Sequence, residues 1–158
     1  MTQQTLTPDD FWPRLDKVQA GMLAAGTARA VPMSHYADRE AGVLWFITAQ
    51  GTDIQQASVH PAEAVYIVAS GDGKLYARIH GTAQVIHDRA QLEELWNPIA
   101  GSWFDGGIDD PDVRLVKMTL SEAEVWATDG GLRFLYETAK AHVTGETPDM
   151  GVNGVLRF

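Results

Sequence analysis

The chain has 158 residues, of which 45% are hydrophobic, and its formal net charge at pH 7 is −9. That length and hydrophobic content predict one domain over residues 1–158 with a buried core, and they exclude a disordered chain. The absence of cysteine excludes disulfides, thiolate metal sites and cysteine nucleophiles. Because nucleic-acid binding requires a basic stripe and none is visible, we expect no nucleic-acid partner.

The hydropathy pattern also argues against a membrane protein. The longest apolar runs, such as Val43–Thr48, are far shorter than the about 20 residues that a spanning helix needs. The opening segment MTQQTLTPDDFWPRL has neither a basic start nor an apolar run, so we expect no signal peptide. These features predict a cytoplasmic protein with no membrane partner.

The first predicted element is a helix. Thr7 offers an N-cap, and Pro8 suits the first helical position. The apolar residues that then recur at helical spacing are Phe11, Leu15, Val18 and Met22. This stripe predicts a helix that continues to a stop at Gly26.

After this helix the hydrophobic period changes to two, which predicts strands. They span Thr27–Tyr36, Gly42–Thr48, Ala62–Ser70, Lys74–His87 and Val113–Thr128, the last being one long strand or a strand pair. Ser70-Gly71-Asp72-Gly73 predicts a tight hairpin turn. Helices are predicted over Thr52–Val59, Asp88–Ala100 and Gly131–His142. Antiparallel strands joined by short turns, with helices between them, favour a β-barrel with helices packed outside.

The histidines and the acidic stretch Asp105–Asp112 do not predict a metal site. His80 and His87 are seven residues apart on one predicted strand, so they face opposite sides. An EF-hand loop starting at Asp105 would need glycine and glutamate where Asp110 and Val116 stand. No serine lies in a G-x-S-x-G elbow, which argues against a nucleophilic hydrolase.

The polar face of the Lys74–His87 strand is the main candidate for ligand binding. Tyr76, Arg78 and His80 project together from this face. An arginine flanked by aromatic groups can hold a planar, anionic ligand. The alternative interpretation is an ordinary solvated strand face.

Seven short segments carry a family resemblance in combination. They are FWPRL in the first helix, Val31-Pro32-Met33, Leu44-Trp45-Phe46-Ile47-Thr48, Gly81-Thr82-Ala83, Leu95-Trp96-Asn97-Pro98, Trp103–Gly107 followed by Asp109-Asp110-Pro111, and Ala123-Glu124-Val125-Trp126. Together they resemble the general stress protein branch of the pyridoxamine 5′-phosphate oxidase-like superfamily of FMN-binding split barrels. The resemblance covers residues 10–145, nearly the whole chain.

This resemblance implies a mainly β fold with flanking helices, built on a six-stranded antiparallel split β-barrel. It also implies a homodimer with two FMN sites at the subunit boundary, another flavin being the alternative cofactor. The implied function is an FMN-binding flavoprotein with oxidoreductase activity, in which the flavin supplies the redox chemistry. The alternative is a flavin-binding or stress-response module without turnover. No residue stands out as a catalytic acid or base.

The resemblance also assigns residues to the flavin site. They are Val31, Pro32, Met33, Phe46, Ile47, Thr48, Thr52, Arg78 and Trp103. The backbone of the first three residues would lie along the edge of the isoalloxazine ring. The next three residues would line the ring and the ribityl chain. Thr52 would lie near the phosphate, because a helix N-terminus presents free N–H groups to an anion. Arg78 would approach from a neighbouring strand, and Trp103 would close the site from the second chain.

The sequence departs from the family pattern at two basic positions. Val31 stands where the family has arginine, and Gln55 lies where a basic residue is expected near the start of the short helix. Each lost cation removes a charge-assisted hydrogen bond worth about 1.5–3 kcal/mol. Arg29 and Arg78 therefore become the candidate phosphate ligands. The alternative is that both arginines form ion pairs between subunits.

Overall fold

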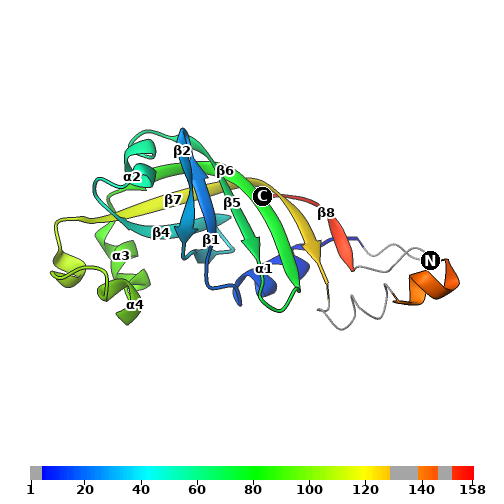
Figure 1. Cartoon of the computed structure of the whole chain (residues 1–158). Coiled ribbons are helices and arrows are strands. Elements are labelled where there is room, and N and C mark those ends of the chain that lie inside the picture. Colours follow the sequence, from blue (N-terminus) through cyan, green and yellow to red (C-terminus); the bar gives the residue numbers. More distant parts are fainter. Residues whose placement is uncertain (1–4, 129–138, 146–150) are drawn as a thin grey trace.

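The computed structural model describes residues 5–128, 139–145 and 151–158, in which a curled antiparallel sheet dominates (Figure 1). Its strands are β1 (Gly21–Ala25), β2 (Ala28–Met33), β3 (Tyr36–Asp38), β4 (Val43–Ala49), β5 (Ala62–Ala69), β6 (Leu75–Ile86), β7 (Val113–Ala127) and β8 (Val152–Arg157). The helices are α1 (Pro8–Leu15), α2 (Asp53–Ala57), α3 (Arg89–Leu95) and α4 (Pro98–Gly101), with a 3₁₀ turn η1 (Gly107–Asp109) and a helical stretch over 139–144. Each helix in the described part of the chain is too short or too polar to span a bilayer.

The strands follow the order β2-β1-β5-β6-β7-β4-β3, and β8 adds to β7. Every pairing is antiparallel, and within the described residues the two end strands, β2 and β3, do not pair with each other. The sheet therefore curls into a barrel that stays split, which confirms the predicted mainly β class. The strand number exceeds the expected six, because the predicted strand over Thr27–Tyr36 breaks into β2 and the start of β3, and because β1 and β8 were not expected.

The first helix ends earlier than predicted. It stops at Leu15, and Gly21 already begins strand β1. The helical spacing extended to Met22 because a two-residue period and a helical period coincide at some positions. Tertiary packing favours the strand. Because a Cβ at Gly21 would lie only 2.8 Å from the ring of Tyr66, the glycine allows β1 to approach the core closely. The prediction of a helix over residues 16–26 is therefore wrong.

Alternation along β6 is confirmed. Leu75, Ala77 and Ile79 are buried, whereas Tyr76 and Arg78 are exposed. The hairpin turn at residues 70–73 also forms: Gly73 N donates to Ser70 O at 3.0 Å, and the turn joins β5 to β6. The predicted segment over Val113–Thr128 is one strand, β7.

Strand β4 is buried on both faces. Leu44 and Phe46 belong to the barrel core, whereas Val43 and Trp45 pack in a second cluster. That cluster also contains Leu92 of α3 and Leu115 of β7. Helix α3 therefore covers the outer side of β4 and β7, and α3 and α4 project from the barrel in Figure 1.

The predicted helix over Asp88–Ala100 is broken into α3 and α4 at Asn97. Asn97 Oδ1 accepts hydrogen bonds from Ile99 N at 2.9 Å and Ala100 N at 3.0 Å, and Pro98 takes the first position of α4. An N-cap followed by proline starts a new helix rather than continuing the old one. The other predicted helix, Gly131–His142, lies mostly outside the described residues, which are helical over 139–144.

Gly81 sits at a bulge and tolerates no side chain. The register of β6 on β7 shifts between His80 and Gly81, and a Cβ on Gly81 would lie 2.2 Å from the Thr119 carbonyl oxygen. We expect Gly81→Ala to lower the free energy of unfolding by about 1–3 kcal/mol, the cost of overpacking, measured by urea denaturation. Gly71→Ala is the matched control, because no heavy atom lies within 4 Å of its Cβ position. Equal stabilities of the two variants would contradict this reading of the bulge.

Candidate functional site

Two threonines form a polar pair where β4 ends and α2 begins. Thr52 caps α2: its hydroxyl accepts from Gln55 N at 3.2 Å and donates to Ala49 O at 3.0 Å. Thr48 Oγ1 lies 3.0 Å from Thr52 Oγ1. Since the single Thr52 proton goes to Ala49, Thr48 is the donor in this contact. Thr48 and Thr52, predicted to line one ligand, are therefore in direct contact.

The side chains next to this pair are polar but uncharged or acidic. Gln55 Oε1 accepts from Gly51 N at 3.0 Å, so the side chain of Gln55 folds back onto the turn before α2. Asp53, the first residue of α2, is exposed. No basic side chain comes from α2 itself.

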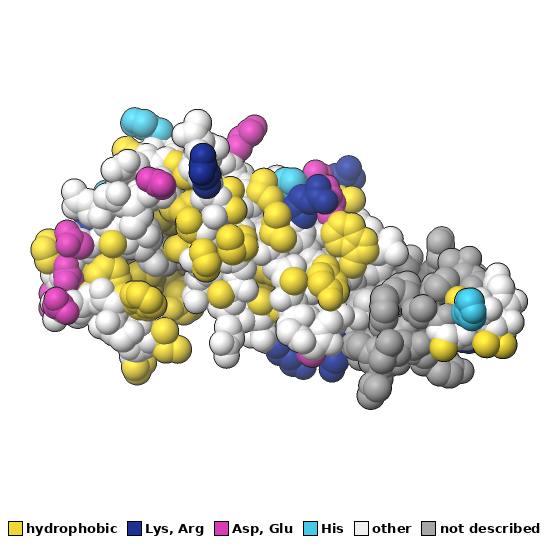
Figure 2. Space-filling view, viewed as in Figure 1, with side chains coloured by type: hydrophobic (Ala, Val, Ile, Leu, Met, Phe, Trp, Pro, Cys, Tyr) yellow, Lys and Arg dark blue, Asp and Glu magenta, His cyan; other side chains and the backbone are white. Residues whose placement is uncertain are grey.

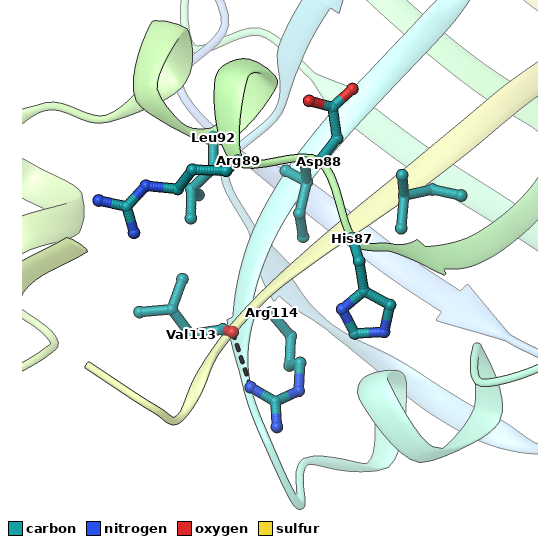
Figure 3. Close-up of a pocket in the computed structure, with 8 residues that line it drawn as sticks. His87, Asp88, Arg89, Leu92, Val113 and Arg114 are labelled. Atoms are coloured by element: carbon teal, nitrogen blue, oxygen red, sulfur yellow. Dashed lines mark hydrogen bonds between the residues drawn. The ribbon is translucent and has the colours of Figure 1, made fainter. Parts of the chain in front are cut away.

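A cation from another strand lies at this end of the barrel. Arg114 of β7 pairs in register with Thr48 of β4, and its guanidinium donates to Gln50 Oε1. It also donates to Pro111 O at 2.7 Å and to Val113 O at 2.8 Å, the contact dashed in Figure 3. Sequence reasoning missed Arg114, because only the pairing of β4 with β7 brings it beside Thr48.

Strand β2 reaches the same end with its first residues. The helix α2 contacts β1, β2 and β4. Arg29, near the start of β2, is exposed and has no hydrogen bond or ion pair among residues 5–128, 139–145 and 151–158. Further along β2, Val31 and Met33 are half-buried against the barrel core, whereas Pro32 is exposed. Arg29 is thus an unpaired cation on a strand that α2 touches.

Three further residues predicted for the site differ in their burial within one chain. Phe46 is fully buried, with its ring centroid 5.0 Å from that of Tyr66 in the core. Ile47 packs against the second cluster on the opposite side of β4. Trp103 follows α4 and is 80% exposed. Of these, Ile47 faces away from the threonine pair within one chain.

Arg78 is also distant from the threonine pair. It lies eight residues before Ile86, the end of β6 that neighbours Arg114, which corresponds to about 26 Å along a strand. Its Nε is 3.2 Å from Glu124 Oε2, so a carboxylate on β7 already shares its charge. Glu124 Oε1 also lies 3.7 Å from His80 Nε2. Within one chain, Arg78 and Thr52 therefore cannot contact the same phosphate.

The outer face of the sheet combines these charged groups with exposed apolar side chains. We define the outer face by Met22, Ile67, Tyr76, Trp126 and Val155, which are 41–53% exposed. Register pairs Met22 with Ile67, Ile67 with Arg78, Arg78 with Glu124 and Glu124 with Val155, so one row crosses five strands. Figure 2 shows hydrophobic side chains gathered over β1, β2, β5 and β6. A contiguous apolar surface of this kind marks an interaction site.

A buried polar contact ties the end of β2 to the core. His35 Nδ1 lies 2.7 Å from Tyr66 Oη, and His35 Nε2 lies 3.1 Å from Leu15 O. The Tyr66 hydroxyl also reaches Met33 O at 2.9 Å. Burial lowers the pKa of His35, partly offset by its hydrogen bond to Leu15 and the charge of Asp16, and burial raises the pKa of Tyr66. Both shifts favour the neutral forms. Nε2–H of His35 then donates to Leu15 O, and the single proton of the Tyr66 hydroxyl is available to either His35 Nδ1 or Met33 O.

The family profile described as "Pyridoxamine 5′-phosphate oxidase like" matches residues 7–149 of the chain. A search of curated proteins finds no match. Among solved structures, the chain is similar to a protein described as a general stress protein 26 from Jannaschia sp. CCS1. The two are 46% identical with a TM-score of 0.83, and the match covers 94% of this chain and 96% of the other.

Two further structures share the fold over most of the chain. A general stress family protein from Xanthomonas campestris pv. campestris is 26% identical with a TM-score of 0.69, covering 78% of this chain and 88% of the other. A protein named as a general stress FMN/FAD binding protein from Xanthomonas citri is 24% identical with a TM-score of 0.70, covering 78% and 89%. The split barrel is therefore common to all three structures.

The half-buried His35 predicts how stability depends on pH. In the unfolded chain His35 takes up a proton near its usual pKa of 6.5, whereas in the folded protein it does so only at lower pH. Below pH 6.5 the unfolded state binds more protons, so the free energy of unfolding falls as pH falls, by up to about 1.4 kcal/mol per pH unit. Above pH 6.5 this contribution is fully present.

We therefore expect His35→Gln to flatten the decline in stability between pH 7.5 and pH 5, measured by urea denaturation at each pH. His60→Gln is the control, because His60 is exposed and should leave the wild-type slope in place. A His35→Gln variant with the same slope as the wild type would show that another group causes the decline.

Proposed function

The chain belongs to the pyridoxamine 5′-phosphate oxidase-like family, and from this membership we propose that it is a flavin-binding protein of the general stress type, with FMN as its cofactor. The observation that carries the proposal is the 46% identity to a general stress protein 26 over 94% of the chain. A protein of the same fold from Xanthomonas citri is named as FMN/FAD binding, which supports a flavin as the ligand.

The proposed phosphate end of the site is the threonine pair with α2. Thr48 and Thr52 are in contact, and the N–H groups of the first two residues of α2 have no partner within the helix. Arg29 is the unpaired cation on the neighbouring strand β2. From there the flavin ring would extend along β2 towards Val31, Pro32 and Met33, as the family resemblance implies. An anion is favoured here by short contacts, because the net charge of −9 gives no long-range attraction.

A homodimer completes this proposal. The outer face exposes five large apolar side chains around the Arg78–Glu124 ion pair, and a second copy of the chain is the proposed cover. Obligate dimers usually bury about 2,000 Å² or more in total. In such a dimer Arg78 and Trp103 would reach the flavin of the partner, because neither lies near the threonine pair of its own chain.

Flavin binding without turnover is the second candidate function. It is favoured by Val31 and Gln55 in positions where cations are expected, and by the exposed carboxylate of Asp53 at the start of α2. Oxidation of reduced nicotinamide in the presence of FMN separates the two candidates. Steady turnover well above that of free flavin rejects the non-enzymatic candidate, whereas bound flavin with no added turnover supports it.

Flavin binding itself is tested by titration of the purified protein with FMN. We expect quenching of FMN fluorescence and a change in its absorption spectrum at tens of micromolar, because the isoalloxazine ring leaves water for a protein surface. The control is the same titration with unfolded protein. An unchanged spectrum throughout this range would refute the proposed function.

The dimer is tested by one substitution on the outer face. Ile67, 48% exposed in the single chain, lies in the row across five strands, between Met22 and Arg78. We expect the wild type to sediment as a dimer and Ile67→Glu to sediment as a 17.3 kDa monomer, because a carboxylate would lose its hydration in the interface. Gln19→Glu introduces the same charge at an exposed turn and should remain dimeric. A monomeric wild type at micromolar concentration would exclude the proposed dimer.

A further inference from the structure

A pocket of about 290 Å³ lies where β6 ends and β7 begins, beside α3 (Figure 3). His87 and Arg114 project to the same side, whereas Arg89 extends away from them. The floor is apolar and includes Leu92 and Leu115 of the second cluster. The volume is slightly below the range for small-molecule sites, about 300–1,000 Å³, so the pocket does not hold a whole flavin.

Arg114 differs from the other arginine of this pocket in how its charge is balanced. Arg89 forms ion pairs with Glu93 at 3.0 Å and Asp109 at 2.7 Å. Arg114 donates only to neutral oxygens, those of Pro111, Val113 and Gln50, and within the described ranges no carboxylate pairs with it. Its positive charge is therefore uncompensated by any described residue.

The same contacts leave donors available and fix their direction. A guanidinium has five N–H groups, and the three bonds above occupy three of them. The Nε–H and one N–H of Nη2 remain. Because Gln50 N also donates to Asp112 O at 2.8 Å, the loop after β4 holds the start of β7 in place. Arg114 is thus a preorganised cation, which loses little freedom when it binds an anion.

Strand pairing puts this cation next to the proposed phosphate end. Arg114 pairs in register with Thr48, and Thr48 contacts Thr52. The residue just after α2 is held against the end of β6, because Val85 N of β6 donates a hydrogen bond to Ser58 O at 2.7 Å. Figure 3 shows the helix after β4 on the side to which His87 and Arg114 point.

We propose that Arg114 binds the phosphate of the flavin and replaces the cations missing at Val31 and Gln55, with His87 as a neighbouring donor. This inference rests on the proposed function and adds a phosphate-binding residue that the sequence did not indicate. The phosphate monoester would accept from the free Nε–H and Nη2–H in the planar arrangement that arginine provides.

Fluorescence titrations of Arg114→Gln with FMN and with riboflavin test this assignment. We expect FMN affinity to fall about ten- to a hundredfold, as when a charge-assisted hydrogen bond is lost, and riboflavin affinity to change less than about twofold. Arg89→Gln is the matched control from the same pocket, and it should leave both flavins unaffected because carboxylates already pair with Arg89. Arg29→Gln tests the competing cation.

Two further measurements keep the outcome decisive. Inorganic phosphate should compete with FMN but not with riboflavin in the wild type, and Arg114→Lys should retain part of the FMN affinity if Arg114→Gln does not fold. Equal losses for both flavins, or a phosphate-specific loss in Arg29→Gln but not in Arg114→Gln, would overturn the role of Arg114 while flavin binding stands. A wild type that binds riboflavin and FMN equally overturns it as well. A wild type that binds neither flavin overturns this inference together with the proposed function.

Discussion

The pairing of β7 along both of its edges is the constraint on which the rest of the structure depends. One edge pairs with β6 over nearly the full strand, and the other pairs first with β4 and then with β8. A straight strand could not serve three neighbours in a curled sheet, and the register shift at Gly81 supplies the bend. The absence of a side chain at Gly81 is what lets the two backbones approach there. The barrel core, the position of α3 and the strand end beside α2 all follow from this strand.

The curled sheet divides its surface into regions with different roles. On β4 and β7 the outer side is covered by α3, through the second cluster of Trp45, Leu92 and Leu115. Across β1, β5, β6, the second half of β7 and β8 the outer face exposes apolar side chains, and it is the surface proposed to meet a second chain. The strand ends near α2 are polar. The covered side, the proposed interface and the proposed ligand end therefore all come from one sheet, because successive residues of a strand face opposite sides and its two ends meet different loops.

Charge is distributed unevenly over these regions. Arg78 on the outer face is neutralised by Glu124, and Arg89 beside α3 is neutralised by two carboxylates. Arg29 has no partner in the described part of the chain, and Arg114 contacts only neutral oxygens there. In an acidic protein an anionic ligand depends on such local cations, since attraction at longer range is screened and opposed by the net charge. The two arginines without a described carboxylate partner both come from strands that border the α2 end.

The sequence by itself determined what local patterns encode: the buried alternation of Leu75, Ala77 and Ile79, the hairpin at residues 70–73, and the family through its short motifs. It could not decide where α1 ends, because helical and strand periods overlapped until the contact of Gly21 with Tyr66 selected the strand. It also could not show that Arg78 lies far from Thr52 within one chain, or that Arg114 lies beside Thr48. These relations arise from strand pairing between residues far apart in the sequence, such as Thr48 and Arg114, and only the folded sheet brings such residues together or keeps them apart.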